Sequence, residues 1–239
     1  MPVLFSVVTA ARARTRANQP TRTPGARALR ADAERTVRTI LEAAERVLRD
    51  NPAATVEQIA EAAGVARTTV HRRFATREAL IEAMTAWATQ QFADAVRAAR
   101  IDTTPSLVGL YQVTANVLRV KIDWNFAMNR APHASPEVAR VHADVLATCT
   151  HLLRRAQDAG VIRADVDVEW ARTVYYALIH EATQRASRAG ADASAADAGA
   201  ADAGTAGAAE NEVTDTDALA ALVVDTLLRG VGPAGGAAL

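Results

Sequence analysis

Residues Thr55 to Leu80 read TVEQIAEAAGVARTTVHRRFATREAL, and this stretch decides the fold. It contains two short helical patterns separated by Gly64, a residue that permits a tight backbone turn. Thr55, followed three residues later by Gln58, matches a capping box and predicts the first helix start. Small and apolar residues recur where the two helices would cross, namely at Ile59, Ala60, Ala63, Val65 and Val70. The stretch therefore predicts a helix-turn-helix.

The second helix of this pair, expected from about Arg67 to Phe74, carries a basic and hydrogen-bonding face. If Val70 and Phe74 face the core, two rows of residues spaced by four must face outward together, Arg67 with His71 and Thr68 with Arg72. In a DNA major groove, arginine can bind guanine and threonine can touch a thymine methyl, while other contacts hold phosphates. The candidate DNA-contacting residues are Thr55, Arg67, Thr68, Thr69, His71, Arg72, Arg73 and Arg77. The alternative is an ordinary solvated helix face, but charge placed on a correctly spaced helix-turn-helix favours DNA.

The charge of the chain is unevenly distributed although its total is zero. Residues 1–78 carry 14 arginines and 8 acidic residues, a net charge of +6, and the remainder carries −6. A basic end and an acidic end are expected when one part meets phosphate and the other does not. Arginine supplies 26 of the 27 basic residues, a bias that suits phosphate contact but is also typical of a GC-rich genome.

The rest of the sequence predicts an all-α protein of about nine helices. Alanine is abundant and β-branched runs are short, which favours helices packed through small side chains. A helix with one apolar face is expected from near Asp32 to Asp50. Later starts are indicated by capping residues, alone or followed by proline, at Thr76, Thr104-Pro105, Ser135-Pro136, Asp165 to Asp167, and Asp215.

Here the sequence resembles the TetR family of regulators. Members have a helix of the Leu-x-Ala-Ala type and then a pattern close to I-A-x-x-A-G-V-S-x-x-T-L-Y-x-x-F-x-S-K-E-x-L. This chain offers Ile40 to Ala44, Ile59-Ala60, Ala63-Gly64-Val65, Thr69-Val70, Phe74 and Thr76 to Leu80. Among its departures from the pattern, Ala66 replaces the serine that caps the second helix, His71 replaces tyrosine, and Arg77 replaces lysine.

The resemblance implies a sequence-specific DNA-binding regulator, most simply a repressor that a small molecule releases from a palindromic operator. It also implies a homodimer formed by the last two long helices, at 169–188 and 215–229. The domains expected are a flexible basic arm at 1–30, a helix-turn-helix domain at 31–78 and a helical ligand-binding and dimerisation domain at 79–239. An Ala/Gly/Asp-rich stretch at 189–214 is expected to be a mobile loop because it lacks large apolar groups. The arm either reaches a minor groove or is a disordered tail or a start-site artefact.

The family also implies an inducer pocket among the middle helices. The residues best suited to line it are aromatic, sulfur-containing or imidazole side chains, namely Trp124, Phe126, Met128, His142, Cys149, Trp170, Tyr175, Tyr176 and His180. An aromatic or methionine side chain at helical spacing is more often part of the core than of a ligand wall. Because few charges lie among them, a hydrophobic or aromatic ligand is expected.

Other classes of function lack a pattern in this sequence. His142, Cys149 and His151 do not have paired metal-ligand spacing, and no phosphate loop or nucleophile elbow is present. We therefore expect no catalytic residues, no metal and no cofactor. One cysteine and the lack of a long apolar run predict a cytoplasmic protein with no membrane partner. A DNA-binding architectural protein without a ligand and an enzyme with an incidental helix-turn-helix remain the competing classes.

Overall fold

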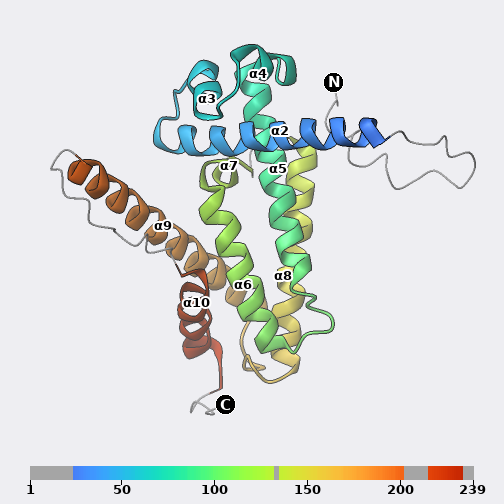
Figure 1. Ribbon diagram of the computed structural model, residues 1–239. Coiled ribbons are helices and arrows are strands. Elements are labelled where there is room, and N and C mark those ends of the chain that lie inside the picture. The colour runs from blue at the N-terminus through green and yellow to red at the C-terminus, as the bar shows by residue number, and fades with distance from the viewer. Residues whose placement is uncertain (1–23, 132–134, 202–214, 234–239) are drawn as a thin grey trace, which may run out of the picture. The chain divides into compact units, whose positions relative to one another are not determined.

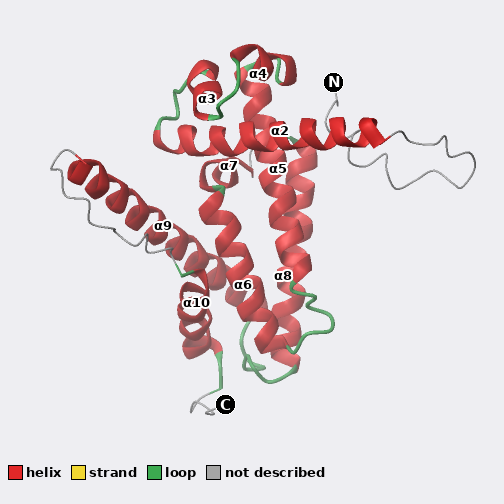
Figure 2. Cartoon of the chain, in the orientation of Figure 1, coloured by secondary structure: helices red, strands yellow, loops and turns green. Residues whose placement is uncertain are grey.

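The computed structural model describes residues 24–131, 135–201 and 215–233, and in these ranges the chain is built from helices and loops (Figure 1). Nine helices and no strand occur within them, which confirms the all-α prediction (Figure 2). The chain divides into two compact units, one ending at Ala86 and the other beginning at Trp87. Each unit has its own core.

The first unit contains α2 (Pro24–Asp50), α3 (Val56–Ala62), α4 (Arg67–Arg73) and the start of α5 (Arg77–Ala98). Its core is formed by the apolar faces that the spacing predicts, with fully buried side chains at Ile40, Leu41, Ile59, Val70 and Leu80. Each such side chain is worth roughly 1.5–3 kcal/mol when it leaves water, so these faces hold the short helices in place.

The start of α2 differs from the sequence prediction. The helix begins at Pro24, well before the expected Asp32. Proline fits the first turn of a helix because its missing N–H would have no partner there. Pro24 and Gly25 therefore lie in the first turn of α2 and do not prevent a helix from starting there. The rest of the predicted basic arm lies outside the described residues.

The second unit consists of the rest of α5, α6 (Ser106–Asp123), α7 (Asn125–Arg130), α8 (Pro136–Asp158), α9 (Val168–Ala201) and α10 (Thr216–Val231). Helix α6 lies at its centre and packs against α8, α9 and α10 (Figure 1). Gly109 allows α6 to approach α8 closely, since a Cβ at this position would lie 3.3 Å from Leu152 Cδ1. The core around this contact includes Leu110, Leu118 and Tyr175.

Several predicted helix starts are confirmed by side-chain caps. Thr76 Oγ1 accepts from the backbone N–H of Ala79 at 3.0 Å, and Ser135 Oγ accepts from that of Val138 at 3.4 Å. Asp215 caps α10 in the same way. Thr104 does not cap α6: its hydroxyl donates to the carbonyl of Ala99, which closes the preceding turn.

The predicted loop at 189–214 is wrong over its first part, because α9 continues to Ala201. Alanine has the highest helix propensity of all residues, so this segment can extend a helix without large side chains to pack. The remaining residues of the predicted loop fall outside the described ranges.

Neither a membrane-spanning helix nor a metal-binding cluster of side chains occurs among the described residues. None of the described helices is long and apolar enough to cross a bilayer. Across the same residues, no three histidine, cysteine or acidic side chains gather as a metal site would require.

Candidate functional site

Helices α3 and α4 meet at the tight turn that Gly64 makes possible. Gly64 has φ = 65°, in the left-handed region that favours glycine. The turn is closed by two backbone hydrogen bonds, from Gly64 to Glu61 and from Val65 to Ala60, each 3.0 Å long. Before it, Thr55 and Gln58 form the predicted capping box, with Gln58 Oε1 accepting from the Thr55 N–H at 2.8 Å. The helix-turn-helix is therefore closed by local contacts at both ends of α3.

The two sides of α4 differ as the spacing predicts. Val70 is fully buried, and Phe74, which follows the helix, is 4% exposed. The opposite side of the helix exposes Arg67, Thr68, His71, Arg72 and Arg73, whereas Thr69 is half-buried. The helix thus presents arginine, threonine and imidazole groups together on one outward face.

Arg67 is held by two neighbours within the first unit. Its Nε lies 2.6 Å from Glu57 Oε1 and donates to His71 Nε2 at 3.2 Å. The pKa of Glu57 is lowered, first by its own backbone N–H at the start of α3, then by the Thr55 hydroxyl, with Arg67 adding to the effect. The ionised carboxylate of Glu57 therefore orients Arg67 along the outward face. The contacts of Arg67 with Glu57 and with His71 both use its Nε.

Arg77 contacts the backbone of its own unit. Its Nε donates to the Ala54 carbonyl at 2.9 Å, and its Nη2 donates to the Pro52 carbonyl at 2.5 Å. The sequence placed Arg77 among the candidate DNA-contacting residues and did not indicate this clamp, since a contact 23 residues away leaves no local pattern. Arg77 joins the loop before α3 to the first turn of α5.

The capping departure noted at Ala66 is present in the structure. Ala66 is the N-cap of α4 and has extended backbone, but α4 has no side-chain hydrogen bond at its first turn. The second helix of the pair is therefore held by packing at Val70 and Phe74 rather than by a cap.

A cavity of about 240 Å³ lies in the second unit. Its lining comes from α5, α6, α8 and α9: Phe92, Val117, Lys121, His142, Leu146, Cys149, Tyr175, Tyr176, Ile179 and His180. Five of the residues proposed from sequence are among them, namely His142, Cys149, Tyr175, Tyr176 and His180. An apolar enclosure with a few polar groups is the usual form of a small-molecule site.

Four of the proposed pocket residues lie elsewhere. Met128 is buried in the core, Phe126 lies beneath the Arg130 guanidinium at 4.9 Å, and Trp124 is half-buried between α6 and α7. Trp170 is 63% exposed. Helical spacing places residues on a common face but does not tell which neighbour that face meets.

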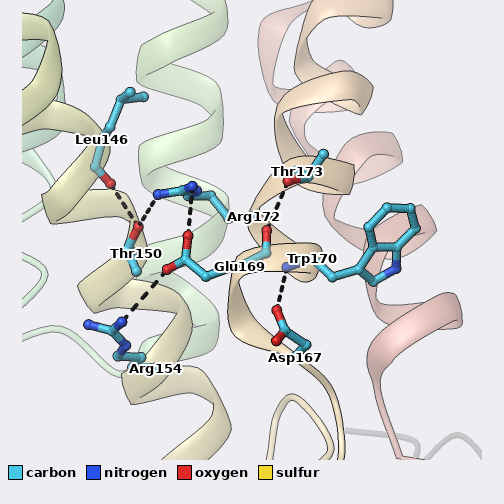
Figure 3. Close-up of polar contacts among 8 residues, drawn as sticks. All are labelled: Leu146, Thr150, Arg154, Asp167, Glu169, Trp170, Arg172 and Thr173. Carbon is cyan, nitrogen blue, oxygen red and sulfur yellow. Dashed lines mark hydrogen bonds and ion pairs between the residues drawn. The ribbon is translucent and has the colours of Figure 1, made fainter.

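The surroundings of Trp170 show why it stays outside. Helix α9 is held to α8 through Arg172, which pairs with Glu169 at 2.6 Å and donates to Thr150 Oγ1 at 3.2 Å. Glu169 also lies 3.7 Å from Arg154 of α8. In Figure 3 the Trp170 side chain points away from these contacts, so the polar side of α9 faces α8 and the indole does not.

Sequence reasoning missed five of the lining residues: Phe92, Val117, Lys121, Leu146 and Ile179. Four are ordinary apolar residues that no pattern separates from the core. Lys121 did carry a signal, because it is the single lysine in a chain that otherwise uses arginine. Lysine suits a compact point-charge contact, whereas arginine suits a planar one.

Burial changes the acidity of the groups around the cavity. It raises the pKa of the Cys149 thiol to about 11 and also raises those of Tyr175 and Tyr176. The pKa of His142 is lowered by burial and then by Lys121, and that of Lys121 is lowered by burial alone. These shifts favour a neutral thiol and neutral phenols, and they disfavour the charged form of the imidazole.

A second, more open hollow lies against α5 and α8. It is about 450 Å³ in volume and is lined mainly by exposed residues, including Arg97, Asp102 and His151. His151 Nε2 lies 3.3 Å from Asp102 Oδ1. His151 therefore faces a different hollow from His142 and Cys149.

The helix-turn-helix is the part of the chain that a known protein family matches. A family model described as "Bacterial regulatory proteins, tetR family" matches residues 40–84. The HTH-type transcriptional repressor LfrR of Mycolicibacterium smegmatis is 32% identical over 154 residues, which are 64% of this chain and 80% of LfrR. The chain belongs to the TetR family. As a TetR-family protein it is a DNA-binding regulator of transcription, and these relatives are regulators rather than enzymes.

Solved TetR-family structures share the fold over most of the chain. LfrR from Mycobacterium smegmatis, in complex with proflavine, has a TM-score of 0.60 and 25% identity, and the match covers 85% of this chain and 99% of that one. PfmR from Thermus thermophilus also has a TM-score of 0.60, with 17% identity and coverages of 81% and 99%. The resemblance to TetR regulators therefore extends beyond the helix-turn-helix to the helices of the second unit.

Proposed function

We propose that this TetR-family regulator is a repressor that binds a palindromic operator as a homodimer and leaves it when a small molecule enters the 240 Å³ cavity. The observation that carries the proposal is the outward face of α4, where Arg67, Thr68 and Arg72 are exposed opposite buried Val70. A helix of this kind enters the major groove and reads base edges, with arginine suited to guanine and threonine to a thymine methyl.

Phosphate contacts are assigned to the remaining polar groups of the helix-turn-helix. His71 and Arg73 are exposed on α4, Thr69 is half-buried there, and Thr55 is exposed at the start of α3. Arg77 keeps N–H groups beyond those it gives to the loop carbonyls, and these are available to a phosphate. Such contacts position the protein without reading sequence.

Dimer formation is supported by large apolar side chains that α9 and α10 leave exposed. Trp170 is 63% exposed and Leu222 is 52% exposed, which is unusual for large apolar side chains. Val174 and Leu178, at helical spacing from Trp170, are half-buried. A dimer formed by covering these side chains would carry two α4 helices, the number that two successive major grooves require.

Ligand release is supported by the cavity and by the relative. LfrR, a repressor, has been solved in complex with proflavine. The cavity of the present protein is lined by helices of the second unit and contains both apolar and polar side chains. A ligand that fits only one conformation of the protein shifts the population toward it, which is how its binding would weaken DNA affinity.

The proposal is tested on DNA taken from upstream of the gene. The full chain should protect a palindrome whose half-sites lie about 10 base pairs apart, or a multiple of that spacing, and should elute as a dimer. A library of small aromatic and aliphatic compounds should include one that reverses the mobility shift. Binding without sequence preference would instead indicate an architectural DNA-binding protein, and tight operator binding that no cavity ligand weakens would contradict release.

A further inference from the structure

The cavity wall carries a positive charge and no negative one. Lys121 of α6 lines it, and none of the lining residues is acidic. Among the described residues no carboxylate forms an ion pair with Lys121, and burial alone accounts for its lowered pKa. An ammonium group that is partly removed from water without a counter-ion is costly, and a bound anion would offset this cost.

A hydroxyl group on the same wall lacks a strong partner. The Tyr176 hydroxyl is buried and has no oxygen or nitrogen partner within the described part of the chain, and it interacts only with the Cys149 thiol, a weak hydrogen-bonding group. The neighbouring Tyr175 differs, because its hydroxyl is 2.7 Å from Thr114 Oγ1, which in turn donates to the Leu110 carbonyl. Buried hydroxyl groups nearly always have partners, so Tyr176 has a donor to offer a ligand.

His142 adds a third polar group to this wall. Its ring stacks on Phe92 with 6.0 Å between the ring centres. Lys121 lines the same cavity, and its charge contributes, after burial, to the lowered pKa of His142. An imidazole beside an ammonium can accept a proton once an anion arrives to balance both charges.

From these three groups we propose that the cavity binds a small organic carboxylate, whose anionic group lies against Lys121 and His142 and accepts from the Tyr176 hydroxyl, while its apolar body fills the space beside Phe92. The inference rests on the proposed ligand response and names the class of ligand. It also separates this protein from LfrR, whose solved ligand is proflavine.

The size of the cavity suits a ligand of about two rings. Its 240 Å³ lies below the roughly 300–1,000 Å³ of sites for drug-sized molecules. Naphthalene-2-carboxylate, naphthalene-2-methanol and naphthalene-2-methylamine are therefore suitable probes, because they share one apolar body and differ in charge. Calorimetric titration of each into the full-length protein measures the preference.

The carboxylate should bind about ten- to hundredfold more tightly than the alcohol, as a charge-assisted contact allows, and the amine should bind most weakly. Lys121→Met, which keeps an apolar chain of similar length, should remove the preference for the carboxylate. Arg140→Met is the matched control, since Arg140 is an exposed cation on α8 outside the cavity lining, and it should keep the preference. Thermal unfolding of both variants verifies that they fold.

The pH dependence gives an independent readout. The titratable groups facing His142 from the helices around it are Lys121 of α6, Cys149 of its own helix, and Tyr175, Tyr176 and His180 of α9. Because a bound carboxylate raises the pKa of His142, binding takes up a proton, and affinity for the carboxylate should rise as the pH falls from 8 to 6. In His142→Phe this rise should be smaller.

Four outcomes would each overturn the inference: equal binding of the three probes, tighter binding of the amine, failure of the carboxylate to bind, or an unchanged preference for the carboxylate in Lys121→Met. Operator binding without ligand is measured on the same preparations. A chain that binds its operator but prefers the amine loses the carboxylate assignment only, whereas a chain that does not bind an operator contradicts the proposed function itself.

Discussion

Replacing Arg77 by methionine tests whether the first unit depends on the clamp between α5 and the loop before α3. The substitution removes both hydrogen bonds of the guanidinium and keeps most of the apolar stem. The Pro52 carbonyl is in an exposed residue and can bind water instead, so its loss should cost little. Ala54 is 1% exposed, and leaving its carbonyl without a donor should cost about 1–3 kcal/mol.

Amide hydrogen exchange localises this effect. The N–H of Ile59, bonded to the Thr55 carbonyl at 3.1 Å, reports on the opening of α3. Its exchange should become roughly five- to hundredfold faster in Arg77→Met, while amides of α6 should not change. Arg77→Lys is the control, because an ammonium group can reach one carbonyl but not both and should give an intermediate rate.

The same two variants separate the clamp from a phosphate contact. If Arg77 also binds phosphate, Arg77→Met should reduce the salt dependence of operator binding by about one counterion, and Arg77→Lys should preserve it. Unchanged exchange at Ile59 in Arg77→Met, with weaker DNA binding, would refute the clamp and leave Arg77 as a phosphate ligand alone.

Three further predictions concern the cap of α4, the buried thiol and the dimer. Ala66→Ser supplies the missing side-chain cap at an extended N-cap position, so urea titration should show the free energy of unfolding of the first unit raised by about 1 kcal/mol. Lower stability of the variant would show that the site cannot accept the cap. Cys149, with a pKa of about 11, is almost entirely un-ionised at pH 8 in the native protein, so its reaction with iodoacetamide should be more than about a hundredfold slower there than in urea. Comparable rates in the two conditions would place the thiol in solvent. If the proposed dimer forms through α10, Leu222→Glu should give a monomer in light scattering and lower operator affinity, whereas a variant that stays dimeric would exclude α10 from the interface.

The helix-turn-helix could be predicted from sequence because its determinants are local. Gly64, the Thr55 cap and the buried Val70 all act within a few residues of one another, and the structure places each as the pattern indicates. The role of Arg77 was not predicted because the carbonyls it binds lie 23 and 25 residues away.

The lining of the cavity was predicted only in part, for a related reason. The type of side chain singled out Tyr176 and His142, but it could not tell that Trp170 faces outward, since that depends on which side of α9 packs against α8. Lys121 could have been found from its rarity in the sequence. Its position on the wall follows from long-range packing of α6 and is visible only in the structure.

The role of α4 as the reader of DNA is tested by the ratio of operator affinity to affinity for a shuffled duplex. In the variant with Arg67, Thr68 and Arg72 all changed to alanine, this ratio should fall at least about a hundredfold, since each base contact contributes about 1–3 kcal/mol. The matched control changes Arg97, Thr103 and Arg140, which are exposed residues of the second unit, and should keep the wild-type ratio. If the first variant retains the wild-type ratio, the outward face of α4 does not read the operator.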